Sequence, residues 1–289
     1  MGGWKRTVLA DWDEGAIADS DTSKTVKLPQ AIISSIHLRL SGTGGSGTVA
    51  VDNLIATTKV KTDKGYIFDM RSADMHILAR AITARKPTIT NGTSAYSETN
   101  HSIYFGRHPK DKMGLLDLRN SNVRLIELTF GTLIATTAFA TTTVKLTVTI
   151  EEWVGELPAE YRGFISAKEV EDKATGTGKC VFELFSGDKL LGVFINISAI
   201  TTVRQVTITD KKDSVIFGKA NFRDLLNLHN AEYAVDTVET LNALWRLVGW
   251  EDMLTTQIPM LSMSDPILAI ERGTTTTTSR VVQLSLKSP

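Results

Sequence analysis

The sequence lacks several features that would place a protein quickly in a functional class. It has no surplus of either charge, because 32 lysines and arginines balance 32 aspartates and glutamates. Without excess cations to exchange for phosphate counterions, the chain is not expected to bind nucleic acid directly. Its single cysteine, Cys180, excludes an intramolecular disulfide framework and a multi-cysteine metal site.

Long apolar runs are missing as well. The longest stretch without a charged residue, residues 128–144, is 17 residues long and contains seven threonines. Because β-branched threonine favours strands, this stretch is not expected to cross a bilayer as a helix. No apolar run of signal-peptide length precedes Asp11, so we expect neither secretion nor membrane spanning.

Threonine is abundant instead, with 37 residues or about 13% of the chain. Together with Val and Ile it favours half-buried strands. Apolar and polar residues alternate in several short segments, which are residues 36–40, 144–150, 191–197 and 282–286. A period of two over many short segments predicts an all-β fold, an antiparallel sandwich or barrel.

Helical spacing is limited to three segments, residues 72–84, 221–230 and 236–254. The last is the longest, and its apolar stripe is expected to pack against a sheet. The stripe consists of Val238, Leu241, Leu244, Trp245 and Val248.

Elements of the first half recur in the same order in the second half. An alternating strand at residues 36–41 precedes a Thr-Asp-Lys triplet (62–64), an Ile-Phe pair (67–68) and a helical segment. A similar strand at residues 193–198 precedes the same triplet (209–211), the same pair (216–217) and another helical segment. Each half then closes with a Thr-rich loop and an alternating strand. This common order predicts an internal duplication.

A polar stretch at residues 153–174, with Gly155, Pro158 and Gly163, separates the two halves. It predicts an N-terminal segment of residues 1–25, a first sandwich of residues 26–155 and a second of residues 156–289. The zero net charge divides into +3 for residues 1–155 and −3 for residues 156–289.

No catalytic constellation is evident. The glycine-rich residues 41–47 lack the Gly-Lys-Ser/Thr of a phosphate-binding loop, and no Gly-x-Ser-x-Gly elbow is present. None of the histidines forms a His-Glu-x-x-His pattern. They are His37, His76, His101, His108 and His229. We therefore predict no catalytic residues and no cofactor.

The acidic N-terminal segment offers the only metal candidates. Asp11, Asp13 and Glu14 are spaced roughly like the start of a calcium loop. Gly15 occupies the third ligand position and no closing glutamate follows, which excludes an EF-hand. The three acidic residues remain candidates for a loose calcium site.

The pattern resembles the double jelly-roll major capsid proteins of tailless, membrane-containing icosahedral bacteriophages of the corticovirus type. The resemblance runs from about residue 26 onward and is carried by residues 36–42, 102–107, 144–151 and 221–226. It implies two tandem eight-stranded jelly-roll β-sandwiches with short helices.

The resemblance also implies a function. Homotrimers would form pseudo-hexameric capsomers of an icosahedral viral shell, in contact with neighbouring capsomers and with penton, vertex and minor capsid proteins. The shell would cover an internal lipid membrane that the N-terminal segment contacts. The protein would be assembled in the host cytoplasm and located in the virion.

An alternative from another class is a tandem β-sandwich that binds carbohydrate or protein. Its exposed aromatic residues would be Tyr96, Tyr104, Trp245 and Trp250. A third class, the cupin-like enzymes, requires clustered His and Glu ligands that this sequence lacks.

Overall fold

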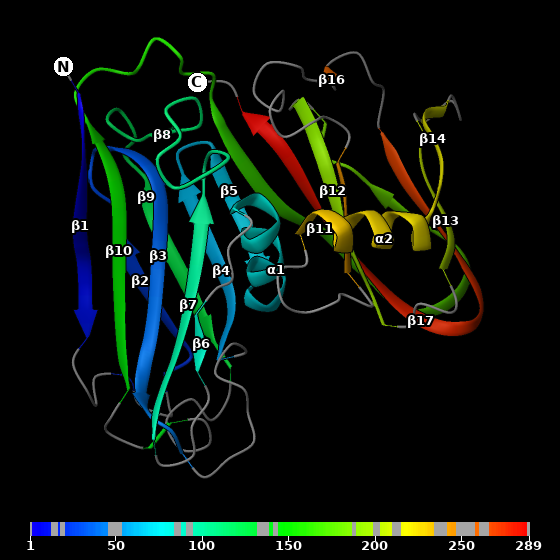
Figure 1. The fold of residues 1–289 in the computed structure, drawn as a ribbon, viewed down its shortest axis with the longest axis horizontal. Helices are drawn as coiled ribbons and strands as arrows, with labels where there is room; N and C mark the ends of the chain where they lie inside the picture. The colour runs from blue at the N-terminus through cyan, green and yellow to red at the C-terminus, as the bar shows by residue number, and fades with distance from the viewer. Residues whose placement is uncertain are drawn as a thin grey trace. The chain divides into compact units, whose positions relative to one another are not determined.

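The computed structural model of the chain describes residues 2–12, 17, 21–45, 54–83, 88–90, 95–131, 139–140, 144–186, 189–198, 203–209, 215–233, 242–246, 258–259 and 266–287. The chain divides into two compact units, residues 1–164 and residues 165–288. Figure 1 follows the chain through both units from its blue N-terminus to its red C-terminus.

Two antiparallel sheets form the first unit and face one another (Figure 1). One runs in the order β1 (Gly3–Trp12), β10 (Lys145–Val154), β3 (Ile32–Thr43), β7 (Tyr96–Tyr104) and β6 (Ile89–Thr90), and β8 (Leu116–Asp117) also pairs with β3. The other runs in the order β5 (Gly65–Arg71), β4 (Ile55–Thr62), β9 (Arg124–Phe130) and β2 (Ser23–Lys27). Helix α1 (Ser72–Thr83) follows β5 directly and contacts β7, β4 and β5.

The alternation of residues 36–40 fixes the register of the central strand β3. Ile36, Leu38 and Leu40 are fully buried. Burial of each such side chain stabilises the fold by about 1.5–3 kcal/mol. A slip of one residue would turn all three toward the outer face, so the slip is strongly disfavoured. The residues of β10 that lie opposite them are also fully buried, namely Ile150, Val148 and Leu146.

The second unit contains seven strands in its described part. They are β11 (Phe164–Glu183), β12 (Lys189–Ile197), β13 (Val203–Thr209), β14 (Val215–Asn221), β15 (Asn242–Arg246), β16 (Ile258–Pro259) and β17 (Ile267–Lys287). Helix α2 (Phe222–Tyr233) follows β14 directly. The core brings together Phe182 on β11, Val193 and Ile195 on β12, Val206 on β13 and Phe222 on α2.

The two units repeat one order of pairing, which confirms the predicted duplication. Strand β3 pairs with β10 on one side and with β7 and β8 on the other. In the same way β12 pairs with the C-terminal part of β17 on one side and with β15 and β16 on the other. Strand β4 lies between β5 and β9, as β13 lies between β14 and the N-terminal part of β17.

Two of the three predicted helices are confirmed, as α1 and α2. The third, over residues 236–254, is wrong where the structure describes it, because residues 242–246 form β15 and pair with β12. Ala243 and Leu244 are buried there, so tertiary pairing overrides a helical spacing that extends over residues outside the described part. No helix in the described ranges is long and apolar enough to cross a membrane.

Strand β1 lies in the segment that the sequence assigned to the N-terminus outside the first roll. It pairs along most of β10, from Gly3 opposite Val154 to Trp12 opposite Leu146. Residues 3–12 thus extend the larger sheet of the first unit. The expected boundaries of the two rolls, 26–155 and 156–289, stay a prediction.

Two glycines close the loop that follows β7. A Cβ atom on Gly114 would lie 2.3 Å from the Cα of Gly106 and 2.6 Å from the carbonyl oxygen of Phe105. Both contacts are to backbone atoms, which cannot move aside as a flexible side chain can. The loop therefore closes only with glycine at position 114.

This contact predicts the effect of a methyl group at each of two glycines. Gly114→Ala should destabilise the first unit by about 1–3 kcal/mol, because overpacking forces the backbone apart. Gly3→Ala is the control, since nothing lies within 4 Å of the added Cβ, and its effect should stay within about 0.5 kcal/mol. Urea unfolding of the full chain measures both, and equal effects would contradict the close contact.

Candidate functional site

The structure places His37 between two serine hydroxyls on the outer side of β3. Its Nε2 lies 3.0 Å from Ser35 Oγ, and its Nδ1 lies 2.9 Å from Ser102 Oγ. Burial, followed by the positive charge of Arg6, lowers the pKa of His37 to about 4. A base this weak abstracts a serine proton poorly at neutral pH, and a hydroxyl orients it in place of a carboxylate. The cluster is therefore a polar network and not a nucleophile with its base.

The other histidines occupy separate places. His76 on α1 and His101 on β7 are buried against one another, with ring centroids 4.2 Å apart. His229 is buried on α2, and His108 is exposed in the loop after β7. Within the described ranges, no group of three His, Cys, Asp or Glu side chains could hold a metal ion.

Of the three calcium candidates, the structure describes only Asp11. Its carboxylate accepts a hydrogen bond from the Thr147 hydroxyl at 2.8 Å and pairs with the Lys145 ammonium at 3.3 Å. Asp13 and Glu14 lie outside the described residues. A calcium site at these three residues stays a prediction.

Neither Cys180 nor the consecutive residues Glu151 and Glu152 form part of a catalytic group in the described residues. Cys180 is buried on β11 with 4% of its surface exposed. Glu151 lies 3.8 Å from Arg6, whereas Glu152 lies 3.0 Å from Lys5. The neighbouring carboxylates thus meet different cations and do not form a two-carboxylate site.

The aromatic residues considered for a sugar platform do not come together in the described part of the chain. Tyr96 is 52% exposed, but its hydroxyl forms hydrogen bonds with Arg39 on β3 and with Glu98 on β7, its own strand. Trp245 packs against the core of the second unit. Tyr104 is half-buried and stacks edge-on with His37, and Trp250 lies outside the described residues.

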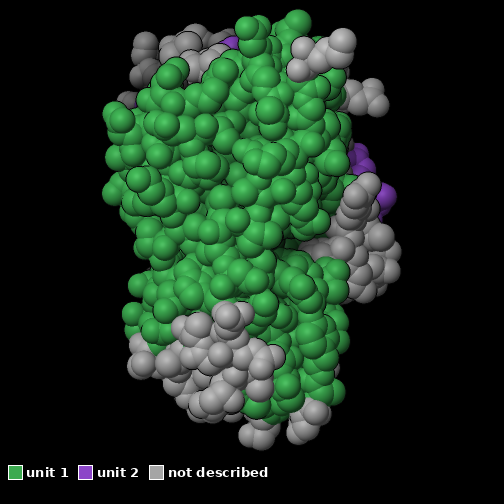
Figure 2. Space-filling view, turned by 90° about the vertical axis from the view of Figure 1, so that its left-hand side faces the viewer, with its two compact units in different colours: residues 1–164, 289 green, residues 165–288 purple. Residues whose placement is uncertain are grey.

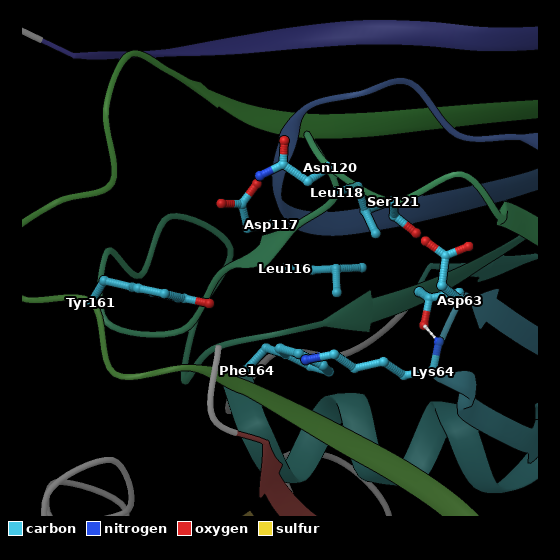
Figure 3. Close-up of a pocket in the computed structure, with 10 residues that line it drawn as sticks. Asp63, Lys64, Leu116, Asp117, Leu118, Asn120, Ser121, Tyr161 and Phe164 are labelled. Atoms are coloured by element: carbon cyan, nitrogen blue, oxygen red, sulfur yellow. Dashed lines mark hydrogen bonds between the residues drawn. The ribbon is translucent and has the colours of Figure 1, made fainter.

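A recess of about 330 Å³ lies in the first unit, beside the Thr-Asp-Lys turn that the sequence repeat contains. Figure 3 shows Asp63 and Lys64 on one side, and Tyr161 with its hydroxyl directed toward the centre, where Leu116 lies. Sequence reasoning missed this recess, because its walls come from segments about 50 residues apart. The lining residues are Thr62, Asp63, Lys64, Leu116, Asp117, Leu118, Asn120, Ser121, Tyr161 and Phe164.

The carboxylates of the recess are occupied by protein groups. The two oxygens of Asp63 accept the backbone N–H groups of Asn122 and Val123, each at 2.7 Å. These bonds lower the pKa of Asp63, as the Arg119 side chain lowers that of Asp117. Burial, and then the negative charge of Asp117, raise the pKa of Tyr161 to about 12. The recess therefore holds two ionised carboxylates and a neutral phenol, without an activated nucleophile.

The loop before β8 positions one wall of the recess through Asp111. This carboxylate, 2% exposed, accepts the backbone N–H of Arg107 at 2.9 Å and that of Met113 at 3.0 Å. It also pairs with the Arg107 guanidinium at 2.9 Å. The carbonyl of Met113 then accepts the backbone N–H of Arg162 at 2.9 Å, next to Tyr161. Asp111 thus connects the loop after β7 to the segment that carries Tyr161.

Three cross-strand ion pairs lie on the outward face of the sheet formed by β1, β10, β3 and β7. Figure 2 shows the first unit from the side on which Figure 1 draws β1. We call the outward face of this four-stranded part of the sheet the ion-pair face. Its three ion pairs are Arg6 with Glu151 (3.8 Å), Lys145 with Asp11 (3.3 Å) and Arg39 with Glu98 (2.8 Å). Three cations and three anions make it neutral as a whole.

Comparison with solved structures identifies the fold. The chain matches the major capsid protein of Sulfolobus turreted icosahedral virus over 99% of its own length and 98% of that chain, with 12% identity and a TM-score of 0.65. The major capsid protein P2 of bacteriophage PM2 matches over 99% and 98%, with 14% identity and a TM-score of 0.64. The PBCV-1 virus capsid matches over 99% and 93%, with 8% identity and a TM-score of 0.68.

These full-length likenesses define the class of fold: the chain is a double jelly roll, and the fold expected from the sequence pattern is confirmed. In described residues of the first unit, eight strands are five or more residues long. At the level of sequence, no family model matches, and no curated protein is similar enough to count as a relative.

The Asp111 contacts predict a stability effect that depends on pH. Burial alone would raise the pKa of Asp111, but bonds from Arg107 and from the backbone of Arg107 and Met113 outweigh it and lower the pKa. A depressed carboxyl pKa stabilises the fold above its ordinary value of 3.8, and this contribution is lost as pH falls through the folded pKa. Asp111→Asn should therefore cost about 2–3 kcal/mol at pH 7.

The matched control is Asp117→Asn, whose partner Arg119 is 41% exposed. Exposed pairs contribute about 1 kcal/mol or less. Urea unfolding at pH 7 should give a larger loss of unfolding free energy for Asp111→Asn than for Asp117→Asn. The difference in unfolding free energy between the wild type and Asp111→Asn should become smaller below pH 4. Equal losses for both variants at pH 7 would contradict the positioning role of Asp111.

Proposed function

We propose that this chain is a viral major capsid protein. The observation that carries the proposal is the tandem pair of jelly rolls, which matches capsid proteins of three viruses over almost the whole of both chains. A likeness of this extent leaves few residues of the chain for an additional catalytic domain. The role proposed is structural, without enzymatic activity and without direct contact to nucleic acid.

The duplication suggests how such a chain would build a shell. Three chains around one axis bring together six similar rolls, so a homotrimer fills a nearly hexagonal outline. Such pseudo-hexameric capsomers can tile an icosahedral shell beside neighbouring capsomers, with penton, vertex and minor capsid proteins at special positions. The location would be the virion, after assembly in the host cytoplasm.

The charge distribution supports dense packing of identical subunits. The chain has no net charge, and the ion-pair face is neutral. Because large like charges repel at short distance, a neutral subunit can lie beside many copies of itself. Cross-strand ion pairs also keep a sheet face polar, which favours weak and reversible contacts over aggregation.

The homotrimer has a direct test. Light scattering behind size-exclusion chromatography should give about 95 kDa, three times the 31.6 kDa of one chain. Electron microscopy of the same fraction should show particles with nearly hexagonal outline, which form arrays as concentration rises. A stable monomer at micromolar concentration that binds glycans would contradict the capsid role and favour a tandem binding module.

A contact between the N-terminal segment and an internal lipid layer is part of the proposal. Trp4 and Trp12, beside Lys5 and Arg6, provide the amphipathic residue types found near lipid headgroups. The purified full chain should co-float with zwitterionic phospholipid vesicles at low and at high salt, because the segment has more acidic than basic residues and the contact rests on the tryptophans. Chain that stays at the bottom of the gradient at every salt concentration would contradict the contact.

A further inference from the structure

A buried histidine joins helix α2 to the neighbouring strand in the second unit. His229 is fully buried. Its Nδ1 accepts the backbone N–H of Leu244 on β15 at 3.2 Å. An amide N–H can only donate, so Nδ1 carries no proton in this contact. The imidazole of His229 must therefore be neutral in the folded unit.

Histidines also lie between helix and strand in the first unit. His76 on α1 and His101 on β7 are 8% and 1% exposed, and their rings lie 4.2 Å apart with an angle of 52° between the planes. The Nε2 atoms lie 3.5 and 3.4 Å from one hydroxyl, that of Thr99 on β7. Two imidazolium groups cannot share so small a buried space without strong repulsion.

We call the contacts His76–His101 and His229–Leu244 helix-to-strand joints. The two joints occupy equivalent positions in the duplicated fold. Strand β7 pairs with the central strand β3, and β15 pairs with the central strand β12. His76 is the fifth residue of α1 and His229 is the eighth of α2. Residues three positions apart lie on one side of a helix. The same helix side therefore presents a histidine to the same strand in both units.

Few charged groups face these histidines in the described part of the chain. On the strands beside His101, the aligned residues are Leu38 on β3 and, beyond it, Val148 on β10. The buried residues of β4 and β5 are uncharged, namely Ile55, Thr58, Val60, Thr62, Ile67, Phe68 and Met70. On α1, Asp74 is buried, and Arg80 lies one turn after His76.

The surroundings of His229 are similarly uncharged on the inner side. Ala243 and Leu244 on β15, and Val206 and Ile208 on β13, are buried and apolar. The charged residues of α2 are exposed, namely Arg223, Asp224 and Glu232. The described residues of β13 and β15 thus offer buried apolar contacts to the imidazole of His229.

We propose that the two helix-to-strand joints, His76–His101 and His229–Leu244, make both units sensitive to acid, so that α1 and α2 detach from their strands as pH falls below about 6.5. Protonation of His229 removes the acceptor for Leu244 N–H and places two donors face to face. Protonation of His101 puts a charge in the core beside His76. The inference concerns the stability of each unit and stands independently of the capsid role.

The direction of the pH effect follows from linkage. Burial, and then the charge of His76, lower the pKa of His101 well below its ordinary value of 6.5. A histidine with a depressed folded pKa destabilises the fold as pH falls below the unfolded value, because the unfolded chain binds the proton more readily. With an unfolded pKa near 6.5, each such histidine raises the unfolding constant about tenfold between pH 7.5 and pH 5.5.

Urea unfolding of the full chain at fixed concentration, from pH 7.5 to pH 5.5, tests the proposal. The unfolding constants of the wild type should rise about tenfold for each of the two histidines over this range, and about tenfold for His37, whose folded pKa is about 4. In the variant His101→Gln with His229→Asn, the contributions of His101 and His229 should be lost, and only the contribution of His37 should remain. Asn places an oxygen where Nδ1 lies and so keeps an acceptor for Leu244 N–H.

The control is His108→Gln, which removes an exposed histidine and should keep the pH dependence of the wild type. If the unfolding constant of the double variant rises between pH 7.5 and pH 5.5 as much as that of the wild type, the proposal is overturned. If that variant does not fold at pH 7.5, amide hydrogen exchange of the wild type decides. After correction for intrinsic rates, protection of α1 and α2 should fall at pH 5.5 relative to β3 and β12, and equal protection would overturn the proposal.

Discussion

The pairing of each central strand on both sides is the constraint on which the rest of the structure depends. Strands β3 and β12 each lie between two antiparallel neighbours, so their side chains must point alternately to the two faces of the sheet. Once Ile36, Leu38 and Leu40 are fixed in the core, the register of β10 and β7 is fixed with them. Helix positions and loop closures follow, because each begins at the end of a strand whose register is already set.

The duplication repeats the backbone plan while the chemistry of the two units differs. The first unit joins α1 to β7 through two stacked imidazoles, and the second joins α2 to β15 through an imidazole and a backbone amide. Asp74, the third residue of α1, is buried, whereas Asp224 at the same position of α2 is exposed. Two modules of one topology therefore differ in the polar groups that they bury and expose.

Sequence reasoning predicted the features that local periodicity controls. Strands β3, β10, β12 and part of β17 followed from alternation, and α1 and α2 from helical spacing. It failed for β15, where a short strand carries apolar residues whose spacing also suits a helix. The recess beside Asp63 and the contact of His76 with His101 were not predictable, because they join segments whose approach depends on the folded sheets. The Thr-Asp-Lys repeat was the one signal that pointed to that region.

Strand β17 gives the two units different mechanical properties. Its first part pairs with β13 and its second part with β12, so one continuous backbone takes the places that the separate strands β9 and β10 hold in the first unit. A pull on the C-terminal end of β17 acts parallel to the strand and loads two sets of interstrand hydrogen bonds in shear. In the first unit the corresponding bonds belong to two strands, which can yield one after the other. The second unit is therefore the one built to transmit tension along a single strand.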